Sequence, residues 1–200
     1  MRVKTEQKRQ EILQIAKEVF EEQGFDSASM AQISTRLGGS KGTLYNYFSS
    51  KEELFVEAML ELAQQHKKHL GCFEFQKGDH IRPLLIAFGT SYTEFISKPW
   101  YLEMLRTVIG FKNNTDVRKQ FYEKGPRKGL TKIAGIFELA AAEGQLKQAD
   151  YLVMARQFKA LLDAEILTPM LLNAMKVPPA ASRKEAVERA IDAFLAIYGK

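Results

Sequence analysis

The sequence predicts an all-α fold, and three observations support this prediction. First, apolar residues recur at helical spacing along most of the chain, as at Ile12, Ile15 and Val19. Second, no segment of comparable length alternates apolar and polar residues, which is the pattern of a half-buried strand. Third, the 200 residues are 46% apolar and 26% charged, the composition of a globular chain with a sizeable core. We therefore expect about nine helices.

Capping residues and glycines mark the first four expected helices. Gly24 is expected to end the first helix. Ser29 and Gln32 have the spacing of a capping box, in which a hydroxyl accepts a hydrogen bond from the backbone three residues later, and they are expected to open the second. By the same reasoning, the third helix is expected to begin at Ser40, and the fourth at Ser49 or Ser50 with Glu52 or Glu53.

Proline and glycine divide the remainder of the chain, because proline cannot continue a helix and glycine favours a turn. The expected boundaries are a linker over 71–79, breaks at 98–99 and 125–126, a helix end at Gly144, a long helix over about 150–173, and a last helix from a Ser182/Glu185 capping box to Tyr198.

Several classes of protein do not fit this sequence. The longest apolar runs, such as residues 84–88, are far shorter than the roughly 18 residues of a membrane span. The basic N-terminus has no apolar stretch behind it, so no secretory signal is indicated. The single cysteine, Cys72, allows no disulfide within the chain. We expect a cytoplasmic protein with no membrane partner.

The charge distribution indicates where an anionic partner would bind. The net charge is +5, but residues 1–70 contain ten basic and ten acidic residues. Between Asp26 and Glu52, however, the chain has no acid and three bases, Arg36, Lys41 and Lys51. This acid-free window is the first place to expect a surface that faces phosphates.

The window contains two short expected helices, residues 29–37 and 40–48, joined by Gly38 and Gly39. This is the arrangement of a helix-turn-helix, whose second helix enters the major groove of DNA. Ser40 exposes backbone N–H groups that favour a phosphate. Three residues of the first turn are expected to lie near base edges, where Lys41 can donate to guanine, Gly42 allows close approach and Thr43 can contact thymine.

The remainder of the second helix divides into a buried and an exposed face. Leu44 and Phe48, four residues apart, are expected to pack against the preceding helix. The other arc carries polar side chains that can reach phosphates, and these position a protein on DNA without recognising its sequence. These residues are Tyr45, Asn46 and Tyr47.

Between Ile12 and Phe55 the sequence resembles the N-terminal DNA-binding domain of the TetR family of transcriptional regulators. The resemblance includes Ser-x-Gly-x-Leu-Tyr-x-Tyr-Phe from Ser40 and Lys-Glu-x-Leu from Lys51. It implies a domain over residues 1–50 that binds an operator in double-stranded DNA. The residues that it implies near bases are Lys41, Gly42 and Thr43, and those near phosphates are Ser29, Tyr45, Tyr47 and Lys51.

The sequence departs from the family pattern at the packing of the two short helices. Ser34 stands where alanine is usual, Gly39 where valine is usual, and Leu37 where alanine is common. The extra volume of Leu37 is expected to fill the space beside Gly39. These departures concern the rigidity of the motif more than its groove-facing residues.

For residues 51–200 the resemblance implies a helical domain that binds an effector and forms a homodimer, so that effector binding releases a repressor from a palindromic operator. Patterns at 121–126, 143–146 and 155–158 resemble the AefR-like subgroup. A small apolar or aromatic effector would suit the aromatic residues here, with Tyr92 or Arg106 as polar anchors. The expected contacts are Phe88, Tyr92, Trp100, Met104, Phe111 and Phe137.

Two apolar stripes suggest the dimer interface, since they are wider than one bundle edge needs. They comprise Phe158, Leu162, Ile166 and Met170 on one helix and Val187, Ala190, Ile191 and Phe194 on the other.

Several features of the sequence have another interpretation. The aromatic residues could be ordinary core. His66, His69 and Cys72 share a helical face but lack a fourth ligand, so no metal or other cofactor is expected.

Seven bases within 112–132, opposed by two acids, could face an acidic effector, DNA or only solvent. A lipid-carrying helical bundle would leave residues 40–51 unexplained. The chain lacks the nucleotide-binding and hydrolase motifs that would indicate an enzyme, so none is expected.

Overall fold

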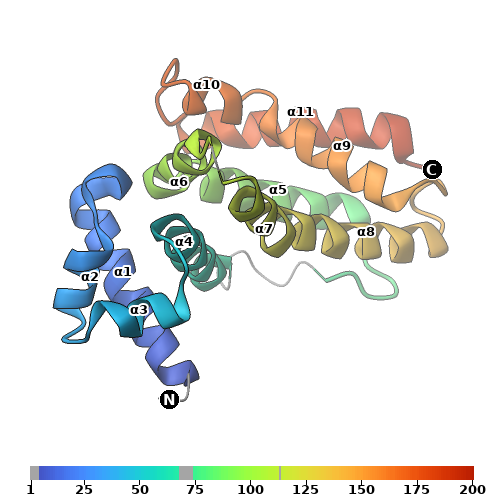
Figure 1. Ribbon diagram of the computed structural model, residues 1–200. Coiled ribbons are helices and arrows are strands. Elements are labelled where there is room, and N and C mark those ends of the chain that lie inside the picture. The colour runs from blue at the N-terminus through green and yellow to red at the C-terminus, as the bar shows by residue number, and fades with distance from the viewer. Residues whose placement is uncertain (1–4, 68–73, 113) are drawn as a thin grey trace. The chain divides into compact units, whose positions relative to one another are not determined.

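The computed structural model describes residues 5–67, 74–112 and 114–200. These ranges contain helices and no strand, apart from an isolated antiparallel bridge between Leu146 and Gly199 (Figure 1). The all-α prediction is confirmed. The helices are α1 (Glu6–Ser27), α2 (Met30–Arg36), α3 (Lys41–Tyr47), α4 (Lys51–Lys67), α5 (Ile81–Ile96), α6 (Pro99–Gly110), α7 (Thr115–Lys124), α8 (Pro126–Ala142), α9 (Tyr151–Asp163), α10 (Leu167–Leu171) and α11 (Ala180–Tyr198).

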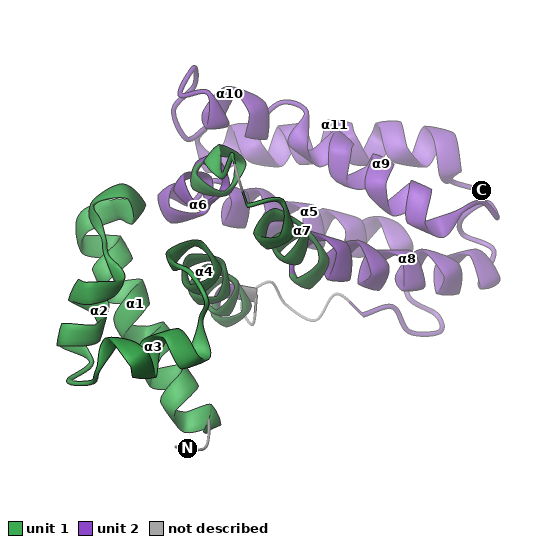
Figure 2. Cartoon of the chain, viewed as in Figure 1, with its two compact units in different colours: residues 1–65, 107–124 green, residues 66–106, 125–200 purple. Residues whose placement is uncertain are grey.

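The chain forms two compact units, which Figure 2 colours separately. Unit 1 comprises residues 1–65 and 107–124, and unit 2 comprises residues 66–106 and 125–200. This division follows compactness, whereas the predicted boundary at residue 50 separates two functions. That functional boundary therefore stays a prediction.

Unit 1 is built from α1 to α3, α4 as far as Gln65, the end of α6 and α7. α1 begins at a Thr5 cap whose hydroxyl accepts a hydrogen bond from the backbone of Lys8. The backbone of Gly24 has φ 74°, which interrupts helical geometry where the first helix was predicted to end. The core includes an aromatic cluster in which the Phe20 and Phe55 rings lie 5.1 Å apart and the Phe25 and Phe111 rings 5.0 Å apart.

Unit 2 buries its apolar residues between α5, α8, α9 and α11. At its centre the Phe194 ring lies 5.0 Å from both Phe137 and Phe158, and all three side chains are fully buried. The helices pack closely at Gly89, where a Cβ atom would lie 2.7 Å from a Val187 methyl carbon. Glycine is therefore required there by the approach of α11 to α5.

The pattern at 143–146, Glu-Gly-Gln-Leu, ends in two residues that join parts of unit 2. The side-chain oxygen of Gln145 accepts a hydrogen bond of 2.8 Å from the backbone N–H of Ile81, at the start of α5. The Gln145 amide also donates to the carbonyl of Asp79. Leu146 is fully buried in the core. Gln145 thus satisfies an N–H group that the helix itself cannot pair.

Two helix boundaries predicted from sequence are wrong. The expected helix over 150–173 is divided into α9 and α10, because Pro169 has no N–H group to continue the hydrogen-bond ladder. The last helix begins at Ala180 after Pro179, and no side chain caps it. Ser182 therefore lies inside α11, and the Ser182/Glu185 capping box does not form.

The apolar stripes of the last helices do not form a surplus surface. All eight residues proposed for the dimer interface are at most 5% exposed within the single chain. All of them except Ile166 and Met170 belong to the core cluster of unit 2. This argument for the dimer is therefore wrong, and any dimer must use other side chains.

Candidate nucleic-acid interface

The predicted helix-turn-helix is present in unit 1 as α2, a short turn and α3. Gly38 has φ 68°, a conformation that glycine adopts without strain, and it turns the chain between the helices. Leu44 in α3 and Ile33 in α2 are both fully buried. The two helices therefore share a core, as the predicted spacing required.

The departures from the family pattern fit one another. The Ser34 hydroxyl donates a 2.9 Å hydrogen bond to the carbonyl of Gly39, so the unusual serine stabilises the turn. A Cβ on Gly39 would lie 3.7 Å from Leu37 Cδ2, which shows that Leu37 occupies the space beside this glycine. These contacts give the turn internal support.

Both short helices begin at the predicted serines. The Ser29 hydroxyl accepts from the backbone N–H of Gln32, and that of Ser40 accepts from Thr43. The Thr43 hydroxyl lies 3.1 Å from the Ser40 hydroxyl. The caps hold the first turn of α3 in helical form and leave the other N–H groups at its start available to an anion.

The first turn of α3 presents an unpaired cation. Lys41 is exposed, and no partner for its ammonium exists among the residues that the structure describes. Gly42 is also exposed, and a Cβ on it would meet only the Ser40 hydroxyl, at 3.7 Å. The fold itself does not require glycine at this position. Because Gly42 has no side chain, there is room beside it for an external partner.

The later residues of α3 are exposed to different degrees. Tyr45 is 51% exposed and Asn46 is also exposed, so both can reach a partner. Tyr47 is half-buried, and its hydroxyl accepts a 2.9 Å hydrogen bond from the backbone N–H of Thr5. Tyr47 therefore joins the start of α1 to the end of α3, in addition to any phosphate contact.

The expected phosphate contact of Lys51 is not supported by its geometry. Its ammonium donates to the carbonyl oxygens of Phe25 at 2.8 Å and Ala28 at 3.0 Å, and lies 3.4 Å from that of Asp26. It also lies 4.2 Å from the centre of the Phe25 ring. These contacts use the three N–H groups of the ammonium. Lys51 joins the start of α4 to the end of α1.

We expect Lys51→Met to lower the free energy of unfolding by about 1 to 3 kcal/mol, because the carbonyls of Phe25 and Ala28 lose a charged donor. Lys41→Met is the matched control, since Lys41 is exposed without such contacts, and it should leave stability within about 0.5 kcal/mol. Urea denaturation of both variants measures this. Equal stability of the Lys51 variant and the native protein would contradict the assigned role.

The third base of the acid-free window is also paired within the chain. Both terminal nitrogens of Arg36 donate to the Glu22 carboxylate, at 2.8 and 2.7 Å, and this pairing lowers the pKa of Glu22. Glu22 lies outside the window in sequence. Of the three bases, therefore, only Lys41 has no partner within the described ranges.

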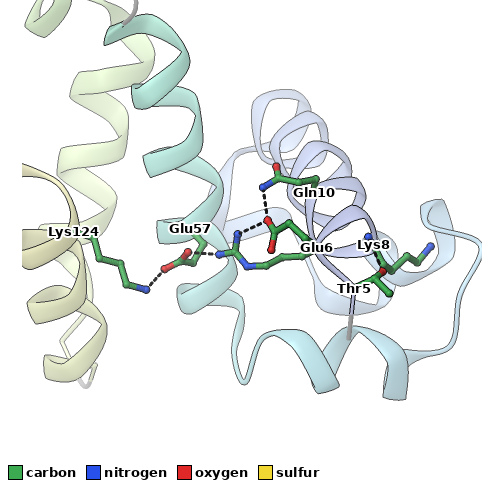
Figure 3. A network of polar contacts seen from close by, with 7 residues as sticks. Thr5, Glu6, Lys8, Gln10, Glu57 and Lys124 are labelled. Atoms are coloured by element: carbon green, nitrogen blue, oxygen red, sulfur yellow. Dashed lines mark hydrogen bonds and ion pairs between the residues drawn. The ribbon is translucent and has the colours of Figure 1, made fainter. Parts of the chain in front are cut away.

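A polar network joins three helices of unit 1 (Figure 3). The Glu57 carboxylate on α4 pairs with Arg9 on α1 and with Lys124 on α7, and its side chain is only 13% exposed. The Arg9 guanidinium also lies 5.6 Å from the centre of the Phe48 ring, which follows α3. The network thus connects α7 with the helices beside α3.

The predicted effector residues have different environments. Phe88 and Tyr92 lie on α5 of unit 2 with stacked rings 5.8 Å apart, and both are half-buried. Met104 and Phe137 are buried in that unit. Phe111 belongs to the aromatic core of unit 1. The six-residue effector site stays a prediction.

Arg106 does not provide the free polar anchor that was expected. Its guanidinium donates to the carbonyls of Leu171 and Met170 at 2.9 and 2.8 Å, and to the Asn173 side chain at 2.6 Å. These bonds reach carbonyls at the end of α10, and that of Met170 also accepts a hydrogen bond from the backbone N–H of Asn173. Arg106 is therefore part of the framework of unit 2.

Sequence reasoning missed a polar group in unit 2. Asp163 on α9 accepts a 2.7 Å hydrogen bond from the Tyr92 hydroxyl and pairs with Lys159 on the same helix. Burial is the main cause that raises the pKa of Tyr92, and the negative charge of Asp163 adds to it. An acid within an otherwise apolar helical stretch was the available signal.

Of the three residues considered as metal ligands, only His66 lies among the described residues. His69 and Cys72 lie outside the described residues, and the ring of His66 lies 5.0 Å from that of Trp100. No group of three potential metal ligands is found in the described part of the chain.

Of the seven bases over 112–132, Lys124 is paired with Glu57. No helix in the described ranges is long and apolar enough to cross a bilayer.

Comparison with known families agrees with this geometry. Residues 12–58 match the family model of the bacterial regulatory proteins of the tetR family. Residues 83–200, more than half of the chain, match the model of the C-terminal domain of AefR-like transcriptional repressors. The chain belongs to the TetR family of transcriptional regulators.

Individual relatives of this TetR-family regulator cover different shares of its length. The transcriptional repressor AcnR of Corynebacterium diphtheriae is 39% identical over 108 residues, which are 53% of this chain and 54% of AcnR. The regulator UidR of Escherichia coli is 43% identical over 61 residues, 30% of this chain and 31% of UidR. The chain thus spans about half or less of these relatives.

Solved structures match the regulator over nearly its whole length. A TetR family regulator from Pseudomonas syringae is 28% identical, with a TM-score of 0.68 and 98% of each chain covered. The flavonoid-responsive regulator FrrA is 25% identical, with a TM-score of 0.79 and 98% of each chain covered.

Proposed function

We propose that this TetR-family regulator is a homodimeric repressor that binds a palindromic operator in double-stranded DNA. In this proposal α3 contacts the bases, and a small aromatic effector releases the protein from DNA. It acts in the cytoplasm, without a cofactor and without catalysis. The observation that carries the proposal is the first turn of α3, with its exposed and unpaired Lys41 beside an exposed glycine.

The geometry of α3 supports a division between base and phosphate contacts. Lys41, Gly42 and Thr43 occupy the first turn, which is where a recognition helix meets base edges. Tyr45 and Asn46 are exposed further along, where hydroxyl and amide groups can bind phosphates. The remaining phosphate contacts are assigned to Ser29, Ser40 and Tyr47. Lys51 is left out, because its ammonium is bonded to carbonyls.

We expect Lys41→Ala and Thr43→Ala each to weaken operator binding by about 1 to 3 kcal/mol and to change the preferred bases. Tyr45→Phe removes one proposed phosphate contact and should weaken binding to all sequences alike. Fluorescence anisotropy with a panel of duplexes that differ at single base pairs measures both effects. Unchanged affinity and base preference in both alanine variants would contradict the assignment of α3.

The proposed dimer follows from membership of the family, whose helical domain after the DNA-binding domain dimerises. The buried stripes cannot form it, but other apolar residues on the same helices are exposed, including Val153 on α9 and Ile197 on α11. A two-fold axis would give two recognition helices. They would contact half-sites about 34 to 36 Å apart, which is one turn of DNA, or a multiple of that distance apart. Sedimentation tests this proposal, and a monomer at micromolar concentration would contradict it.

The effector is proposed to be a small aromatic molecule. Its support is the full-length similarity to FrrA, which responds to flavonoids, together with the aromatic residues of unit 2. If the effector weakens operator binding, operator DNA must weaken effector binding by the same factor, typically about 1 to 3 kcal/mol.

A further inference from the structure

The start of α6 in unit 2 carries two polar groups without hydrogen-bond partners. The indole Nε1–H of Trp100 is buried, and no acceptor for it exists in the described part of the chain. The next residue, Tyr101, is half-buried, and its hydroxyl makes no hydrogen bond among the described residues. A buried tryptophan usually donates a hydrogen bond through its N–H group, so the unpaired indole of Trp100 needs an explanation.

Other aromatic rings lie beside the rings of Trp100 and Tyr101. The ring of Phe95 on α5 lies 4.7 Å from that of Tyr101 and 5.7 Å from that of Trp100. The Trp100 and Tyr101 rings lie 5.9 Å apart, and the ring of His66 lies 5.0 Å from Trp100. Flat apolar faces and unpaired donors therefore occur together, which is the usual composition of a small-molecule site.

The charge beside these donors limits what can bind. The Asp163 carboxylate holds the Tyr92 hydroxyl at 2.7 Å and is balanced by Lys159. Burial raises the pKa of Tyr101 well above its usual value, and the negative charge of Asp163 raises it further. An environment that opposes a phenolate also opposes a ligand carboxylate. A neutral ligand is therefore favoured over an anionic one.

We propose that the cluster of Tyr92, Trp100, Tyr101, Lys159 and Asp163 binds a neutral aromatic molecule through its carbonyl or hydroxyl oxygens. Trp100 and Tyr101 donate hydrogen bonds to those oxygens, and the neighbouring rings pack against the aromatic body. Asp163 is a positioning residue that holds Tyr92 in place. This inference rests on the proposed effector function and specifies the chemical class that the effector must have.

The protein contains its own reporter, because Trp100 is its single tryptophan. Titration of the full chain with 4′,5,7-trihydroxyflavanone should therefore change the intrinsic tryptophan fluorescence in a saturable way. Unsubstituted flavanone, which lacks the three hydroxyls but keeps the ring system and the carbonyl, should bind about tenfold or more weakly. A flavone carboxylate of similar size should bind more weakly still.

Two conservative variants test the donors. Tyr101→Phe, followed by fluorescence, and Trp100→Phe, followed by calorimetry, should each weaken trihydroxyflavanone about tenfold, because each removes one hydrogen bond. Tyr122→Phe is the matched control, since Tyr122 is 41% exposed in unit 1, and it should bind like the native protein. Thermal melting of each variant establishes that it is folded.

The outcomes distinguish the inference from the proposed function. Absence of binding by the native protein overturns the ligand class, and native-like binding by folded Tyr101→Phe and Trp100→Phe overturns the site. Equal affinity for the carboxylate overturns the argument from charge. Operator binding is measured separately without any flavanone, so its presence or absence tests the repressor function and leaves the result on the ligand unaffected.

Discussion

Leu44→Ala is expected to lower the free energy of unfolding by about 2 to 5 kcal/mol, because it leaves a cavity beneath the recognition helix. Leu44 is the fully buried residue of α3, and with Phe48 it attaches this helix to the rest of unit 1. Operator binding should be lost with it, since the first turn of α3 is then no longer held in place. Urea denaturation followed by circular dichroism measures the change in stability.

The neighbouring residue provides the control. Tyr45 is 51% exposed, so Tyr45→Ala should change stability by no more than about 0.5 kcal/mol while still weakening DNA binding. The two variants separate support of α3 from contact with DNA. The assignment would fail if Leu44→Ala were as stable as the native protein, or if Tyr45→Ala were the less stable of the two.

Phe137→Ala is expected to cost unit 2 about 3 to 5 kcal/mol, which is the usual effect of removing a buried aromatic ring. The Phe137 side chain is fully buried, and its ring lies 5.0 Å from Phe194 and 5.6 Å from Phe158. Although the sequence suggested Phe137 as an effector contact, this packing assigns it a core role. Thermal melting of the variant measures the loss.

Leu139→Ala is the matched control on the same helix. Leu139 is 53% exposed, so its removal should change stability by less than about 0.5 kcal/mol. A Phe137→Ala variant that melts like the native protein but no longer binds an aromatic effector would contradict the core role and support an effector contact.

Features that depend on neighbours in sequence were predictable. Apolar spacing predicted an all-α chain, and the caps at Ser29 and Ser40 form as expected because a capping hydroxyl bonds within the next three residues. Even a local rule fails where another local effect is stronger. At Ser182 the preceding Pro179 begins the helix earlier, and the predicted capping box cannot form.

Features that depend on distant partners were not predictable. Lys51 bonds to carbonyls more than 20 residues earlier in the chain, and Arg36 pairs with Glu22 on another helix. A long charged side chain has many possible partners, and only the fold selects among them. Apolar spacing likewise predicts that a helix face is buried without identifying what covers it, which is why the stripe that includes Phe158 was wrongly assigned to a dimer.

The most direct test of the proposed function is selection of duplexes by the full chain from a random DNA library at physiological salt. If α3 contacts bases in a dimer, the enriched duplexes should share an inverted repeat and bind at least about 10³-fold more tightly than scrambled ones. Selection with a Lys41→Ala variant should change bases within each half-site. Binding to all duplexes alike, with no enriched sequence, would contradict the account.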